Sequence, residues 1–70
     1  MDKVKKCISW RRGNTIIGKI ALVDLAAGGW AVDILKTTAS ERHYRHDIDS
    51  AERDYDYYVA LAHRGSLAFD

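Results

Sequence analysis

The sequence has no proline and only one cysteine, Cys7, among its 70 residues. A single cysteine cannot form a disulfide bond within the chain, which fits a reducing compartment. No apolar run approaches the roughly 18 residues of a membrane-spanning helix, and the first residues lack the apolar segment of a signal peptide. Repeats, low-complexity runs and linkers are absent as well. These absences predict one small cytoplasmic domain over residues 1–70, with no membrane partner.

A large excess of one charge sign is also missing, since the formal net charge is +1. The charges are nevertheless separated along the chain. Residues 1–20 carry six basic side chains and one acidic one, whereas residues 47–56 carry five acidic side chains and one basic one. Because nucleic-acid-binding domains are usually strongly basic, this layout favours a protein partner over a nucleic acid.

The composition is that of a globular protein, with 47% apolar and 30% charged residues. A chain this short buries only about 60% of the surface that it exposes when unfolded, and a partner subunit is a common way to gain stability. We therefore expect a folded domain for which a homodimer is one natural form.

Residues 49–65 carry the clearest secondary-structure pattern, an amphipathic helix. Asp49 suits the N-cap, Glu52 can reach back to it in a capping box, and Gly65 suits the left-handed position that ends a helix. Five side chains form an apolar stripe at helical spacing: Ala51, Tyr55, Tyr58, Val59 and Ala62. A helix with one such stripe is not stable alone in water, so it needs a sheet to lie on.

Three stretches predict antiparallel strands. Residues 4–12 and 15–25 are rich in strand formers, and Gly13-Asn14 between them is typical of a two-residue hairpin turn. Residues 30–37 form the third strand, after a turn of two or, preferably, four residues within 26–29. Both turn lengths are even, so strict alternation puts the same residues on one face. That face, where we expect the helix to pack, holds Val4, Ile8, Trp10, Ile17, Ala21, Val23, Leu25, Trp30, Val32 and Ile34.

Residues 37–48 allow two interpretations. Residues 38–41 match a capping box that could open a helix. The alternation of Tyr44, His46 and Ile48 instead favours a fourth strand, with Tyr44 and Ile48 on the core face, and we prefer the strand. The predicted fold class is α+β, a three- to four-stranded antiparallel meander with one C-terminal helix packed on one face. The apolar residues 67–69 form either a clamp across the helix or an edge strand.

The second face of the predicted sheet is surplus apolar surface, because one helix cannot cover both faces. The C-terminal tail and the long side chains of Lys5 and Arg11 could cover it. We prefer a binding face, since contiguous exposed apolar patches usually mark interaction sites. The face holds Cys7 and the four residues predicted as a protein interface, Ile16, Ile20, Leu22 and Leu35.

Two polar surfaces are further candidates. Three acidic residues at helical spacing form a ridge that could engage a basic partner, and Tyr57 points away from the stripe as a potential interface anchor. The ridge consists of Asp49, Glu52 and Asp56. The basic first hairpin offers nucleic-acid binding as the alternative, through Lys3, Lys5, Lys6, Arg11 and Arg12.

Sites for chemistry are poorly supported. His43, His46 and Asp47 do not make the four-ligand set of a structural zinc site, and a strand cysteine such as Cys7 more often packs than reacts. Gly28-Gly29 leads into a strand, so it is a turn rather than a phosphate-binding loop. We therefore predict no enzymatic activity, no metal, no cofactor and no small-molecule substrate.

The order of elements resembles known families. Three antiparallel strands followed by a helix opening Asp-Ile-Asp-Ser-Ala-Glu (residues 47–52) resemble AP2-type and integrase-arm domains, which read DNA with the sheet. The same order and junction resemble some small phage anti-CRISPR proteins. No functional residues are carried over from either resemblance. We predict a non-enzymatic interaction module, a small accessory or inhibitory protein that binds a larger protein or itself. If the second resemblance applies, it is of anti-defence type. The alternative is a small DNA- or RNA-binding module.

Overall fold

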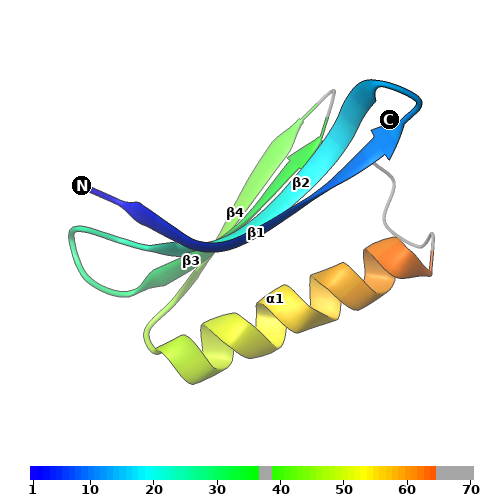
Figure 1. Cartoon of the computed structure of the whole chain (residues 1–70). Coiled ribbons are helices and arrows are strands. Elements are labelled where there is room, and N and C mark those ends of the chain that lie inside the picture. Colours follow the sequence, from blue (N-terminus) through cyan, green and yellow to red (C-terminus); the bar gives the residue numbers. More distant parts are fainter. Residues whose placement is uncertain (37–38, 65–70) are drawn as a thin grey trace.

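The computed structural model describes residues 1–36 and 39–64, which form a four-stranded sheet and one helix. The strands are β1 (Lys3–Arg12), β2 (Thr15–Asp24), β3 (Trp30–Lys36) and β4 (Ser40–Arg45), and the helix is α1 (Ile48–His63). All neighbouring strands pair antiparallel in chain order, β1-β2-β3-β4 (Figure 1). The predicted α+β meander is therefore confirmed, with four strands.

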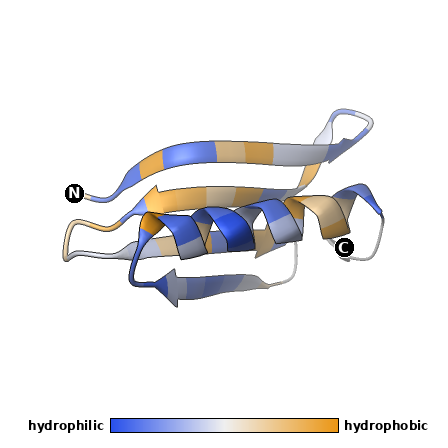
Figure 2. Cartoon of the chain, turned by 90° about the horizontal axis from the view of Figure 1, so that it is seen from below, coloured by the Kyte–Doolittle hydropathy of each residue, from blue (hydrophilic) through white to orange (hydrophobic). Residues whose placement is uncertain are grey.

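The helix lies across one face of the sheet, over β2, β3 and β4 (Figure 2). We call this face the helix side and the opposite one the outer face. The buried core between helix and sheet consists of Ile20, Leu22, Val32, Ile34, Ala51, Tyr55 and Ala62. Within the described part of the chain, no helix is long and apolar enough to cross a membrane.

The helix begins two residues earlier than predicted, with its N-cap at Asp47 instead of Asp49. Asp47 has an extended backbone, and its carboxylate accepts a hydrogen bond from the Ser50 amide at 3.4 Å, so Asp47 rather than Asp49 is the N-cap. Both aspartates precede the apolar stripe, and the cap is the one whose backbone still follows the strand direction. The predicted stripe is confirmed, because all five of its residues are buried or half-buried against the sheet. The predicted end at Gly65 lies outside the described residues.

The predicted hairpin turn at Gly13-Asn14 is confirmed by the pairing of Arg12 with Thr15. Beyond it, Trp10 pairs with Gly18 instead of Ile17, so Ile17 is the extra residue of a β-bulge. A shift of one residue turns every following side chain to the other face. The predicted orientation of β2 is therefore wrong from this point on.

Burial explains why the bulge is favoured. It turns Ile20 and Leu22 under the helix, where both are fully buried, and places Ala21 and Val23 on the outer face. The larger pair thus fills the core under α1, while Ala21 and Val23, at 6% and 3% exposed, are covered by their neighbours on the outer face. A second bulge at Lys5 restores the register, so Val4 still pairs with Val23, as predicted, but on the outer face.

The β2–β3 loop contains a second departure from the predicted pairing. Asp24 pairs with Trp30, so the loop comprises the five residues 25–29, an odd number instead of the predicted even one. The Gly28 amide donates to the Leu25 carbonyl at 3.0 Å, and Gly28 and Gly29 both have positive φ. Because the odd loop cancels the bulge, Trp30 shares the helix side with Trp10, as predicted.

The fourth strand is confirmed, although it spans Ser40–Arg45 and does not reach residue 48. Leu35 pairs with Ser40 across a connection in which the Lys36 amide donates to the Ala39 carbonyl at 2.8 Å. This register puts His43 on the helix side and leaves Tyr44 exposed on the outer face. The predicted core position of Tyr44 is therefore wrong, and Ile48 is the first residue of α1 rather than the last of a strand.

Candidate protein-binding face

The outer face carries exposed apolar side chains from every strand. Val4 of β1 and Tyr44 of β4 are 61% and 64% exposed, and Ile16 of β2 and Leu35 of β3 are 44% and 41% exposed. Pairing places all four on this face, because Val4 and Tyr44 are aligned with the outer residues Val23 and Ala31, Leu35 with Lys19, and Ile16 with Arg11. We call these four residues the outer apolar set.

The set is arranged in rows across the sheet. At one end, Val4 and Tyr44 flank the buried Val23 and Ala31, so that an apolar row runs across all four strands. The middle row contains Cys7, Ala21, Asp33 and Arg42. The other end contains Ile16 and Leu35. The face therefore has an apolar row at one end and a paired polar row in the middle. Its other end mixes Ile16 and Leu35 with polar and basic neighbours, which are Ser9, Arg11, Lys19 and Ser40.

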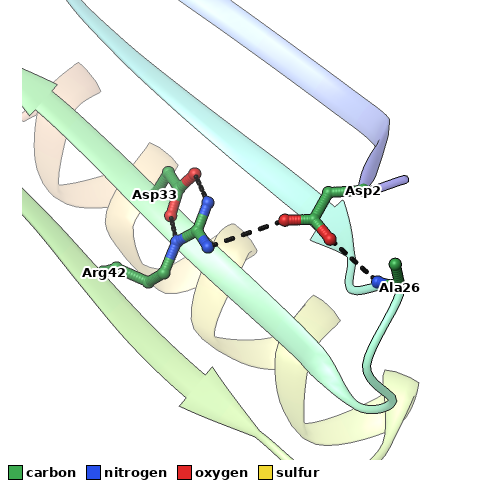
Figure 3. A network of polar contacts seen from close by, with 4 residues as sticks. All are labelled: Asp2, Ala26, Asp33 and Arg42. Carbon is green, nitrogen blue, oxygen red and sulfur yellow. Dashed lines mark hydrogen bonds and ion pairs between the residues drawn. The ribbon is translucent and has the colours of Figure 1, made fainter.

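The polar centre is an internally paired network (Figure 3). The Arg42 guanidinium donates to both carboxylate oxygens of Asp33, from Nε at 2.6 Å and from Nη2 at 2.8 Å. The hydrogen bond to Asp33 raises the pKa of Arg42 above its ordinary value. Asp2 lies 3.9 Å from Arg42 and accepts a hydrogen bond from the Ala26 amide at 2.8 Å. This network fixes the chain start and the β2–β3 loop against β3 and β4.

Open hollows lie at both ends of the sheet. One, of about 140 Å³, is lined by residues 16–19 with Leu35 and Lys36. The other, of about 320 Å³, is lined by Leu25, Gly28, Gly29 and residues 44–46. Ile16 and Leu35 border the first hollow and Tyr44 borders the second. Helix-side residues also line both, Gly18 in the first and Arg45 in the second, so the hollows open at the ends of the sheet.

The predicted apolar interface is only partly available for binding. Ile20 and Leu22 are fully buried under α1 and cannot meet a partner, which corrects their prediction as interface residues. Ile16 and Leu35 are exposed on the outer face, and their role in binding stays a prediction. Sequence reasoning missed Val4 and Tyr44, because it placed both on the core face.

The acidic ridge is divided in the structure. Asp49 and Asp56 are exposed, but Glu52 is half-buried and lies 3.9 Å from the ammonium groups of Lys5 and Lys6. Tyr57 is exposed as predicted, and its ring meets Tyr58 edge-on at 5.3 Å between centroids. Two of the three acids of the ridge are therefore exposed together with Tyr57, whereas the third, Glu52, is directed toward β1.

The basic residues do not gather on one surface. Lys5 and Lys6 turn to the helix side, where their ammonium groups lie 5.4 Å from the Trp30 ring centroid and 5.7 Å from that of Tyr55. Arg11 pairs with Ile16 and belongs to the outer face. Lys3, Arg11 and Arg12 are exposed. The predicted nucleic-acid set is thus distributed over both faces of β1.

The contacts between β4 and α1 are structural. The His43 ring stacks on Tyr58 at 5.2 Å, and Arg45 forms an ion pair with Asp54. Burial raises the pKa of Tyr58, with Asp54 and Glu41 adding to the effect, and burial likewise raises the pKa of Tyr55. Across residues 1–36 and 39–64, no three His, Cys, Asp or Glu side chains converge as a metal site would require. These residues attach the helix to the sheet.

Comparisons of the chain with protein-family models, curated proteins and solved structures found no match. The candidate site is therefore defined by the chain's own geometry, and the outer face is the surface with the most exposed apolar side chains among the described residues.

Proposed function

We propose that this protein is a non-enzymatic interaction module, a small accessory or inhibitory protein that binds another protein surface through the outer face. One observation carries the proposal: each of the four strands contributes one exposed large apolar side chain to the face that α1 leaves uncovered. Exposed large apolar side chains gathered on one uncovered face favour an interaction site. The charges at the centre of the face, Asp33 and Arg42, are already paired with each other.

Magnitudes favour a macromolecular partner. Complete burial of one large apolar side chain contributes about 1.5–3 kcal/mol, so four that are roughly half exposed contribute on the order of 3–6 kcal/mol. Association costs about 4–15 kcal/mol in lost freedom of motion. Burial of the outer apolar set alone therefore does not offset the cost of association, and the remainder of the face must be covered as well. A protein surface can cover the whole face, whereas a small ligand in either hollow cannot.

Paired tyrosine variants test this proposal. Tyr44 on the outer face and Tyr57 on α1 are 64% and 60% exposed, so Tyr44→Ser and Tyr57→Ser remove similar amounts of exposed surface from different places. A partner captured from a lysate of the encoding organism should be retained by the wild type and by Tyr57→Ser. Tyr44→Ser combined with Leu35→Thr should lose it, and the captured partner should slow maleimide labelling of Cys7, which is exposed on the outer face.

The opposite pattern would contradict the proposal. Retention by the outer-face double variant together with loss by Tyr57→Ser would assign binding to the exposed side of α1. Far-UV circular dichroism of each variant checks that lost binding does not reflect lost folding.

A DNA- or RNA-binding module is the second candidate, favoured by the basic residues of β1. The geometry supports it less, because Lys5 and Lys6 lie over aromatic rings and near Glu52. If it applies, wild-type binding to a nucleic acid should weaken steeply with salt, and Arg11→Glu with Arg12→Glu should abolish it. Tyr44→Ser should leave that binding unchanged.

A further inference from the structure

We propose that the free edge of β1, over residues 8–12, pairs with an extended acidic segment of a partner protein, which adds a fifth antiparallel strand to the sheet. This edge is a different surface from the outer apolar set, so the inference goes beyond the proposed function and does not depend on it. In the sheet order β1 is the first strand, and among residues 1–36 and 39–64 it pairs with β2 alone. Alternate residues of such an edge strand direct their N–H and C=O groups outward, where an added strand can pair with them.

The edge is regular over this segment. One register shift adds Lys5 to β1, and the other adds Ile17 to β2 rather than to β1. β1 therefore runs without a bulge over residues 6–12 and can pair continuously there. The opposite edge strand, β4, is shorter, and its His43 and Arg45 hold α1. β1 is thus the longer and less occupied edge.

The helix leaves the segment accessible. α1 packs on β2, β3 and β4, and in Figure 2 the strand that starts at the N-terminus, β1, lies beside the helix. Ile8 and Trp10 stay half-buried on the helix side, where they are paired with Ile20 and Gly18. Apolar side chains of an added strand would lie directly beside them, and cross-strand apolar pairs stabilise a sheet. The centre of the partner segment should accordingly be apolar.

The hairpin end of the segment is basic. Residues 8–23 and the last turns of the helix, residues 57–64, contain no acidic residue. The two stretches meet where the centre of the His63 ring lies 5.7 Å from that of the Trp10 ring. Their basic side chains are Arg11, Arg12, Lys19, His63 and Arg64. Carboxylates of a partner segment are therefore attracted to this end of β1.

The acids of the chain lie away from this end. At the start of β1, the ammonium groups of Lys5 and Lys6 lie 3.9 Å from Glu52, with Asp56 one helical turn further on, so the charge there is partly balanced. Glu41 of β4 is three strands from β1, which is about 14 Å and more than the Debye length of about 8 Å at physiological salt. The acids of the partner should therefore lie opposite the hairpin end rather than along the whole strand.

Two other occupants fit this edge less well. A second copy paired through its own β1 would bring Arg11 and Arg12 of both chains onto two neighbouring strands without an acid between them, and opposed like charges destabilise a sheet. Charged side chains on an edge strand commonly prevent such self-pairing. A nucleic acid has the negative charge, but its phosphates accept hydrogen bonds and donate none, so the C=O groups of the edge would stay unpaired. A polypeptide strand supplies both donors and acceptors.

Binding of a synthetic peptide to the ¹⁵N-labelled full chain tests the proposal. In an antiparallel register, the capped peptide Glu-Glu-Val-Thr-Val-Thr sets its acids opposite Arg12 and Arg11 and its valines opposite Trp10 and Ile8. Saturation should shift the amide signals of residues 8–12, and their outward amides, which exchange rapidly with solvent in the free chain, should become protected. The peptide Lys-Lys-Val-Thr-Val-Thr should bind at least about ten-fold more weakly, because its charges match those of the edge.

Two variants with the same charge change locate the peptide on the edge. Arg11 and Lys19 are both exposed on the outer face, but Arg11 belongs to β1 and Lys19 to β2. Arg11→Glu should weaken binding of the acidic peptide about five-fold or more, as expected for directly opposed like charges. Lys19→Glu, two strands from the peptide, should change it less than about two-fold because of screening. Unchanged amide signals of α1 show that each variant is folded.

Two methylated peptides separate strand pairing from charge alone. Each carries N-methyl groups on alternate backbone nitrogens of the acidic peptide, and the two sets are complementary. Because only alternate amides of the peptide face β1, one set should abolish binding and the other should preserve it.

The contrary results are specific. Absence of binding by the acidic peptide at millimolar concentration, equal binding of both charge versions, or equal loss in Arg11→Glu and Lys19→Glu overturns the proposal. Outward amides of residues 8–12 that are already protected in the free chain show an edge already paired, and overturn it as well. A single-stranded oligothymidylate that binds this segment when the acidic peptide does not assigns the site to a nucleic acid. Tyr44→Ser with Leu35→Thr should bind the peptide as the wild type does, so failure of peptide binding leaves the proposed function untouched.

Discussion

At the scale of single residues, Gly29 shows how the β2–β3 loop is fixed. It has φ +80°, in the left-handed region, and a Cβ at this position would lie 3.0 Å from the Arg45 carbonyl oxygen. The close approach joins the loop to the end of β4. Gly13, in the first hairpin turn, also has a positive φ of 63°, but no atom lies within 4 Å of its Cβ position. The two glycines therefore meet different requirements.

This contrast gives a stability prediction. Gly29→Ala should lower the free energy of unfolding by about 1–2 kcal/mol from the left-handed backbone alone, with the carbonyl contact adding to the loss. Gly13→Ala should cost only the left-handed backbone penalty, because no atom lies within 4 Å of its Cβ position. Urea unfolding of both variants measures the difference. Equal losses would show that Arg45 does not restrict the loop.

At the scale of elements, the orientation of β2 decides which residues form the core. The turn at Gly13-Asn14, the helix stripe and all four strands could be predicted from local pattern, because turn chemistry and periodicity fix them. The bulge at Ile17 could not, since it results from burial of Ile20 and Leu22 under a helix that follows more than 20 residues later. The relative size of these residues and Ala21 was the available signal. Strict alternation therefore placed two core residues in the candidate interface.

Two isoleucines on β2 test this orientation. Ile20→Ala should lower the free energy of unfolding by about 2–5 kcal/mol, because the residue is fully buried. Ile16→Ala, on the exposed outer face, should cost well under half as much in the monomer. Chemical denaturation at low protein concentration compares them. Similar small losses would contradict the bulge and return Ile20 to the surface.

The helix start gives a prediction with a pH dependence. Hydrogen bonds from Ser50, side chain first and backbone second, lower the pKa of Asp47. A carboxyl group whose pKa is lower in the folded state stabilises the fold above its unfolded pKa, and this contribution is lost as the pH falls through the folded pKa. Asp47→Ala should therefore destabilise the protein at pH near 7, and by less once the pH falls below about 4.

Asp49→Ala is the matched control for the helix start. Asp49 lies in the first turn, where a carboxylate interacts favourably with the helix dipole but is not the N-cap, so its loss should be smaller at neutral pH. Thermal unfolding of both variants at neutral and acid pH separates the two positions. A larger loss of stability at neutral pH in Asp49→Ala than in Asp47→Ala would show that Asp49, the N-cap predicted from the sequence, is the N-cap.

At the scale of the whole molecule, part of the charge separation along the chain is satisfied internally. Lys5 and Lys6 of the basic β1 lie 3.9 Å from Glu52 of the acidic helix. Contacts between such partly exposed groups contribute at most about 1 kcal/mol each, and both lie on the helix side of β1. The outer face is left with an apolar row at one end, the paired Asp33 and Arg42 in the middle, and a mixed apolar and basic other end. Its four large apolar side chains stay exposed in the folded chain.

The most direct test of the proposed binding face is a series of ¹⁵N–¹H NMR spectra of the wild type, recorded from dilute to concentrated protein and then with any captured partner. Shifted or broadened amide signals are expected on the outer face, at Val4, Leu35 and Tyr44, and unchanged signals on the exposed side of α1, at Asp56 and Tyr57. Changes confined to α1, with the outer-face signals constant throughout, would contradict this binding face.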